Sequence, residues 1–468
     1  MNFSILLRLS AFSLLFVYLS CSKKNDVIEN RPPENFEVKS ITYENQQYSV
    51  SWSVPNDPDG DILQYDLYVD DVQLLSGSNL TTFSGKLPYN SVHEGRIIAT
   101  DKQGGNSEVS FFLEMPESKI LFFSVDDVVY ALDVNTQKVL WKNQMNGLIR
   151  GLHTTLGDQV FTHFDKLTSR DILTGDVKWI KETNDEYESH FIITDGEAIY
   201  RKINYSAFER LNAEDGSTEW TVSTFESRGP AGIDDQNIYL TDRSSPFLRV
   251  YDKNTGDNKW NFSIPYQYGG DNYYNQIGHT PVVSDNKIFI RTGYGYLFAL
   301  ERESGSIIWQ TRLVTDNISN FKGSETRPLV YEDNLIVLAN SKLFSVKKDS
   351  GEIFWRTDLG VNIYSSPFLY KDYIYFTSDD YLFCVEVATG NLKWKQSVPS
   401  QIQISPIVYD DMIFVGGDDY YYAFNTDDAS EIWRFYTGGY AYTSPTLVIG
   451  ESNKIIYPNL NPSTNGNE

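Results

Sequence analysis

The sequence predicts an all-β chain whose longer part is an eight-bladed β-propeller with four-stranded blades. The main observation is a short sequence motif, which we call the phrase. It recurs eight times, roughly every forty residues, and ends in tryptophan each time. Self-similarity at such a period is the sequence signature of a repeat architecture. The eight tryptophans are Trp141, Trp179, Trp220, Trp260, Trp309, Trp355, Trp394 and Trp433.

Each copy of the phrase reads as a strand, a tight turn and a second strand. Four residues before the tryptophan most copies carry glycine, which reaches positive φ without a Cβ clash and so permits a hairpin turn. Gln137 and Ala429 replace it in the first and last copies, as is typical of terminal repeats. Because the tryptophan occurs once per repeat, we expect a structural role for it. The glycines are Gly175, Gly216, Gly256, Gly305, Gly351 and Gly390.

A second hairpin precedes each phrase, for example at 281–290, so one repeat holds four short strands. This is typical of a propeller blade, whereas a leucine-rich repeat is shorter and a helical repeat has a different period. The first phrase, 119–141, lacks an upstream strand, and 444–449 has no phrase after it. We therefore predict that 444–449 pairs with the sheet of the first phrase. The segment 454–458 is one strand more than this scheme can place.

Changes in composition divide the chain into five predicted segments. Residues 1–20 contain an apolar run that is too short to span a bilayer, which indicates an export signal. Residues 21–34 are polar and read as a tether, and 35–116 read as an immunoglobulin-like sandwich of alternating strands. The propeller is expected over 118–460, followed by a polar tail at 461–468.

The charge of the chain narrows the classes of partner. The net charge is −24, and no stretch of basic residues offers a counter-charge to phosphates. We therefore expect no nucleic-acid partner. With 15% aromatic residues, the chain has ample side chains to bury in sheet interfaces.

The end of the apolar run resembles the lipobox of bacterial lipoproteins. Ser20 and Cys21 follow the run directly, and Ser22 comes next. The resemblance implies that Cys21 is acylated and becomes the first residue of the mature protein. It also implies a lipid-anchored protein of the bacterial cell envelope, at the outer membrane, without a transmembrane helix. The leaflet that the protein faces is left open.

The predicted sandwich resembles a fibronectin type III module. Trp52 stands on its second expected strand, Tyr65 and Tyr68 on its third, and an alternating strand at 96–101 ends in Ala-Thr-Asp. The turn at Asp57–Asp61 has two interpretations, a calcium site or a plain turn between strands.

The repeated phrase resembles that of the pyrroloquinoline-quinone-like propellers. One branch of that family consists of quinoprotein dehydrogenases, and another of non-enzymatic lipoproteins similar to BamB, a component of outer-membrane β-barrel assembly. The enzymes hold a quinone beside calcium, often under a disulfide of adjacent cysteines, whereas the cysteines here are Cys21 and Cys384. The resemblance therefore implies the second branch, with no catalytic residue, no cofactor and no metal. We expect Cys384 to be a small, buried residue on a strand.

The candidate binding site comes from the two longest intervals between tryptophans. These intervals follow Trp260 and Trp309, and insertions in repeats often map to a binding face. Exposed tyrosines beside glycine and asparagine suit a protein or a sugar surface, although packing of the loops against the blades explains them equally well. The candidate residues are Tyr266, Tyr268, Tyr273, Tyr274, Asn320 and Phe321.

Three functions remain in order of preference. The first is a membrane-anchored, non-catalytic scaffold whose propeller binds a protein of the cell envelope, in outer-membrane protein assembly. The second is a surface protein that binds polysaccharide through the same tyrosines. The third is a quinoprotein dehydrogenase.

Overall fold

The computed structural model describes residues 29–44, 46–145, 153–163, 166–182, 192–203, 207–224, 231–241, 247–268, 277, 280–314, 327–339, 341–361, 363, 365–378, 380–399, 402, 404–441, 443–450 and 454–456. Their regular structure is β, apart from one 3₁₀ turn, η1 (Tyr266–Tyr268). Within these residues, no helix has the length and apolar character needed to cross a membrane. The predicted all-β class is confirmed.

Contacts divide the chain into two compact units. The first consists of the residues up to Thr42, Tyr48–Gly85 and Val92–Glu114. The second consists of Tyr43–Gln47, Lys86–Ser91 and the chain from Met115 onward.

Two antiparallel sheets make up the first unit. One has the order β1 (Val38–Glu44), β2 (Gln47–Trp52), β5 (Thr82–Lys86), and the other has the order β4 (Val72–Ser78), β3 (Gln64–Val69), β6 (Val92–Thr100), β7 (Asn106–Glu114). Every second residue of β2 and β3 is buried, and the ring of Trp52 meets that of Tyr65 edge-on at 5.6 Å. The sheets therefore form a sandwich, and its kinship with fibronectin type III modules stays a prediction.

The second unit is a ring of eight sheets, seven of them built from four consecutive strands. Blade 2 runs β11 (Thr154–Leu156), β12 (Gln159–His163), β13 (Lys166–Asp171), β14 (Val177–Glu182). Blade 3 runs β15 (Ile192–Thr194), β16 (Ala198–Ile203), β17 (Ala207–Asn212), β18 (Thr218–Ser223). Blade 4 runs β19 (Gly232–Ile233), β20 (Asn237–Thr241), β21 (Phe247–Asp252), β22 (Asn258–Ser263).

The remaining consecutive blades repeat this order. Blade 5 runs β23 (Val282–Ser284), β24 (Lys287–Arg291), β25 (Tyr296–Glu301), β26 (Ile307–Arg312). Blade 6 runs β27 (Leu329–Tyr331), β28 (Asn334–Ala339), β29 (Lys342–Lys347), β30 (Ile353–Asp358). Blade 7 runs β31 (Phe368–Tyr370), β32 (Tyr373–Ser378), β33 (Tyr381–Glu386), β34 (Leu392–Ser397), and blade 8 runs β35 (Ile407–Tyr409), β36 (Met412–Gly416), β37 (Asp418–Asn425), β38 (Glu431–Tyr440).

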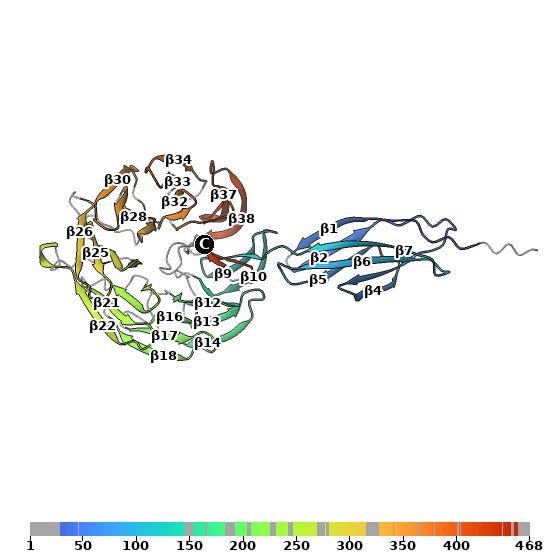
Figure 1. Cartoon of the computed structure of the whole chain (residues 1–468), viewed down its shortest axis with the longest axis horizontal. Coiled ribbons are helices and arrows are strands. Elements are labelled where there is room, and N and C mark those ends of the chain that lie inside the picture. Colours follow the sequence, from blue (N-terminus) through green and yellow to red (C-terminus); the bar gives the residue numbers. More distant parts are fainter. Residues whose placement is uncertain are drawn as a thin grey trace, which may run out of the picture. The chain divides into compact units, whose positions relative to one another are not determined.

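Each blade points from the axis of the ring outward. The short first strands contact the first strands of neighbouring blades; for example, β11 contacts β15, and β31 contacts β35. The fourth strands lie at the periphery (Figure 1). The middle strands are buried almost throughout, and the fourth strands expose most of their residues. The predicted propeller with four-stranded blades is thus confirmed.

Blade 1 closes the ring with strands from two distant parts of the chain. Its order is β10 (Lys138–Gln144), β9 (Val128–Asp133), β8 (Lys119–Val125), β39 (Thr446–Ile449), β40 (Lys454–Ile456). Thr446 pairs with Phe122 and Ile449 with Lys119, which confirms the predicted pairing of 444–449. The strand that the sequence could not place is β40, which lies on the axial side of β39 and also contacts β35 of blade 8.

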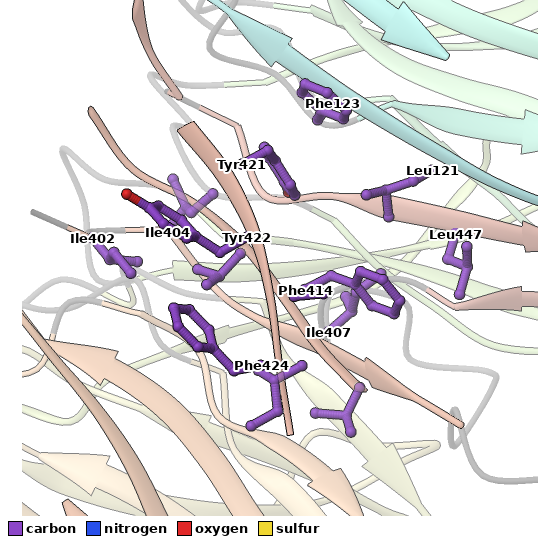
Figure 2. Close-up of a cluster of buried hydrophobic side chains, with 14 of the residues drawn as sticks. Leu121, Phe123, Ile402, Ile404, Ile407, Phe414, Tyr421, Tyr422, Phe424 and Leu447 are labelled. Carbon is purple, nitrogen blue, oxygen red and sulfur yellow. The ribbon is translucent and has the colours of Figure 1, made fainter. Parts of the chain in front are cut away.

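The closing seam, the interface between blades 8 and 1, is apolar. Figure 2 shows Leu121 and Phe123 of β8 together with Leu447 of β39 and Tyr421 of β37. The rings of Phe123 and Tyr421 stack at 4.1 Å between centroids. Burial of these side chains drives the two ends of the ring together.

The tryptophans join each blade to the next. The Nε1–H of Trp309, on the outermost strand of blade 5, donates to the Lys348 carbonyl oxygen of blade 6 at 2.8 Å. The acceptor is always the residue seven places before the tryptophan of the following blade. The other pairs are Trp141 with Ile172, Trp179 with Ala213, Trp220 with Lys253, Trp260 with Arg302, Trp355 with Val387 and Trp394 with Thr426.

The glycines of the turns lie against these indole rings. Gly351 has φ of +73°, and a Cβ added there would stand 2.5 Å from Cε3 of Trp309. The sequence predicted only the turn conformation, and the structure adds the close approach as a second requirement. The remaining five glycines approach the tryptophan of the preceding blade in the same way, namely Gly175, Gly216, Gly256, Gly305 and Gly390.

The structure predicts unequal costs for alanine at Gly351 and at Gly360. Gly360 also has positive φ, at +69°, but nothing lies within 4 Å of an added Cβ. Backbone strain should lower the free energy of unfolding by about 1 kcal/mol at both sites. The clash with Trp309 should add about 2 kcal/mol for Gly351→Ala. Urea unfolding of the two variants checks this, and equal losses would show that the indole contact is unimportant.

Removal of the closing strand should destabilise the ring. A chain ending at Tyr440 loses Leu447, Val448 and Ile449, each at most 3% exposed, and should lose about 5 kcal/mol of stability. A chain ending at Ile456 retains β39 and β40 and is the matched control. Thermal unfolding compares them, and an unchanged melting temperature would contradict the role assigned to closure.

Candidate binding surface at the loop end of the propeller

Antiparallel strands place two kinds of connection at one end of the ring, which we call the loop end. These connections join the fourth strand of a blade to the first strand of the next, and the second strand to the third. The turns that carry the glycines lie at the other end. Both long insertions predicted from the sequence therefore belong to the loop end.

Two of the predicted binding residues lie in η1, directly after blade 4. Tyr266 is 79% exposed, whereas Tyr268 is half-buried and meets the rings of Tyr296 at 5.3 Å and Phe298 at 5.4 Å. Pro265 begins the turn, and its carbonyl oxygen accepts the Tyr268 N–H at 2.9 Å. The structure thus presents one tyrosine to solvent and uses the other for packing. Cys21, Tyr273, Tyr274, Asn320 and Phe321 lie outside the described residues.

The ring of Tyr268 belongs to a patch that the sequence analysis missed. Tyr296 pairs directly with Arg312 across β25 and β26, and the guanidinium carbon of Arg312 lies 5.6 Å from the centroid of the Tyr296 ring. Nε of Arg312 donates to the Val314 carbonyl oxygen at 3.1 Å, which fixes the side chain. We call Tyr266, Tyr268, Tyr296 and Arg312 the aromatic patch. The sequence could have predicted this patch from Tyr294 and Tyr296 on either side of Gly295, because other repeats lack this pair.

The predicted structural residues are not members of this patch. All eight tryptophans stand on fourth strands, with indole groups turned to the next blade or, for Trp433, packed in the closing seam. Cys384 is fully buried on β33, and burial raises the pKa of its thiol to about 11. A thiol with such a pKa is a poor nucleophile at neutral pH.

The turn at Asp57–Asp61 has the features of a plain turn. Oδ1 of Asp57 accepts the backbone N–H groups of Asp59 and Asp61, both at 3.0 Å. The backbone N–H of Arg31 donates to Oδ2 of Asp59 at 2.8 Å, and the Arg31 guanidinium pairs with the same carboxylate at 2.7 Å. Both contacts lower the pKa of Asp59. These contacts favour the turn over the calcium site. Among the described residues, no group of three His, Cys, Asp or Glu side chains could hold a metal ion.

Charged side chains are buried near the loop end of blades 2 and 3. The Nε–H of Arg201 on β16 donates to Oε1 of Glu209 on β17 at 2.5 Å, and both side chains are 3% exposed. Nη1 of Arg201 also lies 3.4 Å from Nε2 of His163 on β12. This network connects blades 2 and 3 through charged and polar side chains.

The ring also contains a buried histidine, His153, which lies directly before β11 and contacts two strands of blade 1. Nε2 of His153 lies 2.6 Å from Oγ of Ser124 on β8, and its carbonyl oxygen accepts the hydroxyl of Thr446 on β39 at 2.7 Å. Burial lowers the pKa of His153 to about 4. The imidazole is therefore neutral in the folded protein at neutral pH.

Seven four-stranded blades and one five-stranded blade, joined by tryptophan and glycine and closed by a C-terminal strand, define a β-propeller of the pyrroloquinoline-quinone-like repeat class. The family described as "Outer membrane protein assembly factor BamB" matches residues 125–311, 247–343, 296–385 and 339–460. These ranges cover well over half of the chain, and the protein belongs to this family. No curated protein matches the chain.

Solved structures share the fold at low sequence identity. BamB from Moraxella catarrhalis is 16% identical, with a TM-score of 0.50 over 66% of this chain and 91% of that chain. A quinohemoprotein alcohol dehydrogenase from Comamonas testosteroni is 12% identical, with a TM-score of 0.51 over 68% and 73%. The dihydro-heme d1 dehydrogenase NirN is 10% identical, with a TM-score of 0.56 over 70% and 74%. The fold thus occurs both in an assembly factor and in dehydrogenases.

Acid should destabilise the ring through His153. Its pKa is about 4 when folded and near 6.5 when unfolded, so the unfolded chain binds more protons between these values. The contribution of this histidine to the free energy of unfolding is highest above about pH 6.5, where His153 is neutral in both states. It falls as the pH drops towards 4, by about 2 kcal/mol between pH 7 and 5. In His153→Gln the loss over this interval should shrink by that amount in urea unfolding. An unchanged pH dependence would contradict the assignment.

Proposed function

We propose that this protein is a non-catalytic, lipid-anchored scaffold of the bacterial cell envelope whose loop end binds another protein. The aromatic patch is the observation that carries this proposal. It combines an exposed tyrosine with an arginine and two further tyrosines that are held by neighbouring strands. Tyrosine and arginine are the residues in which protein interfaces are enriched.

The patch suits binding because most of it is already ordered. Tyr268 is held by η1 and by two aromatic rings, and Arg312 is held by the Val314 carbonyl oxygen. A partner therefore orders few side chains when it binds, which lowers the entropic cost of association. The exposed ring of Tyr266 offers apolar area and a hydroxyl group to the partner.

Membership of the BamB family supports the choice of partner. The family's description names outer-membrane protein assembly, and we propose a component of that process as the protein bound here. Acylation at Cys21 would hold the propeller at the membrane, because buried methylenes of several acyl chains add their free energies. The structural roles of the tryptophans and of the Asp57–Asp61 turn support a function without catalysis.

Site-specific crosslinking tests the proposal. A photoreactive amino acid in place of Tyr266, in the full chain expressed in its envelope, should give one discrete crosslinked product with an assembly protein of the outer membrane. The matched control position is Phe354, which is 57% exposed on the peripheral strand β30. Tyr266→Ala should weaken binding to the crosslinked protein at least roughly fivefold, since a central aromatic contributes above 1 kcal/mol, whereas Phe354→Ala should not.

Two outcomes would contradict this function. Equal crosslinking from Phe354 would show that the loop end has no special role. Retention of the purified protein on polysaccharide gels, lost in Tyr266→Ala, would instead identify the patch as a glycan site. Both outcomes are read from the same pair of variants.

A further inference from the structure

Arg327 occupies a position next to the axis at the loop end of blade 6. It precedes Pro328, after which the innermost strand β27 begins. In four other blades the residue before the corresponding proline carries a hydroxyl group. These residues are Thr280, Ser366, Ser405 and Ser444.

The hydroxyl groups at this position connect neighbouring blades. The N–H of Ser366 donates to Oγ of Ser405 at 2.8 Å, and the N–H of Ser405 donates to Oγ of Ser444 at 2.8 Å. The position therefore forms part of a polar rim around the axis in blades 7, 8 and 1. Arg327 interrupts the repeat with a long cation where a small hydroxyl suffices for packing.

The Arg327 side chain is buried, and it has no counter-charge among the described residues. The residue is 4% exposed, and its Nε and Nη1 atoms have no hydrogen-bond partner within the described part of the chain. Arg201, which is buried to a similar degree, pairs with Glu209. A buried cation without a partner costs several kcal/mol in typical proteins, so its presence needs an explanation beyond packing.

Burial changes the protonation equilibrium of Arg327 without removing its charge at neutral pH. It lowers the pKa of the guanidinium to about 9. A second buried guanidinium, that of Arg291, lies at the loop end of blade 5. Arg291 comes two residues after Phe289 on β24, so the two side chains point to the same face of the sheet. On that face Phe289 belongs to a buried cluster with Leu335 and Val337 of blade 6. Blades 5 and 6 thus each bury an arginine at the loop end, in a chain of net charge −24.

We propose that Arg327 anchors an oxyanion-binding site at the loop end of the propeller axis. Its planar guanidinium matches a carboxylate or a phosphate group through parallel N–H donors. The low exposure restricts access to a small group, either a free anion or the acidic end of a larger ligand. This site goes beyond the scaffold function and does not depend on it, because none of its residues belongs to the aromatic patch.

Anion titration of the full chain tests the site. Sodium phosphate, acetate, galacturonate and neutral galactose are compared by calorimetry and by melting temperature, at an ionic strength held constant with sodium chloride. At least one of the three anions should bind and raise the melting temperature. Binding of phosphate or acetate indicates a free anion, whereas binding of galacturonate alone indicates the acidic group of a larger ligand.

Variants distinguish a binding site from a structural residue. In Arg327→Gln the dissociation constant should rise roughly tenfold or more, and Arg327→Lys should bind with intermediate affinity. Without anion, Arg327→Gln should melt at a higher temperature than the unaltered chain, because it removes an unpaired buried charge. A residue needed only for packing would give the opposite shift. The control is Arg434→Gln, an equal loss of charge on the peripheral strand β38, and it should bind as the unaltered chain does.

Three results would overturn the proposal. The first is that none of the three anions binds the unaltered chain. The second is that binding persists in Arg327→Gln with unchanged affinity. Equal weakening in Arg327→Gln and Arg434→Gln would have the same force, since it would reduce the effect to net charge.

Discussion

The contact between an outer-strand tryptophan and the glycine turn of the next blade is the interaction on which the ring depends. It supplies a hydrogen bond, as from Trp309 to the Lys348 carbonyl oxygen, and a close fit of the indole against Gly351. Each of blades 2 to 7 carries both partners of this contact, with its tryptophan facing the next blade and its glycine facing the previous one. A blade with this pair can therefore add another blade of the same kind, and repetition of one local rule builds the whole architecture.

Closure is the second constraint, and it explains why the ends of the ring differ from its middle. Gln137 and Ala429 stand where other blades have glycine, and both adopt positive φ. The seam between blades 8 and 1 compensates with its aromatic and aliphatic cluster, to which β39 contributes Leu447 (Figure 2). The pairing of β39 with β8, from distant parts of the chain, covers two sheet edges that could otherwise pair with other molecules and aggregate.

Binding chemistry arises where the repeat is interrupted. Repeated positions are fixed by packing and cannot vary without loss of stability, so unique side chains are free to serve a ligand. Tyr266, Tyr296 and Arg312 interrupt the pattern in blade 5 and the turn before it, and Arg327 interrupts it in blade 6. Both departures lie at the loop end, one in the aromatic patch that we propose binds a protein and one at the buried cation that we propose binds an anion.

By itself the sequence determined the all-β class, the blade, the turn and the pairing of 444–449 with the first blade, because these follow from a short period and from local turn chemistry. Of the candidate site it identified Tyr266 and Tyr268, through the length of an insertion. Only the tertiary structure decided that each of the six turn glycines faces a tryptophan, that Tyr268 packs on Tyr296, and that β40 lies beside the axis. It also decided that Arg327 is buried with no counter-charge in the part of the chain that is described. These facts depend on contacts between blades, which join residues far apart in the chain and leave no mark on the period of the repeat.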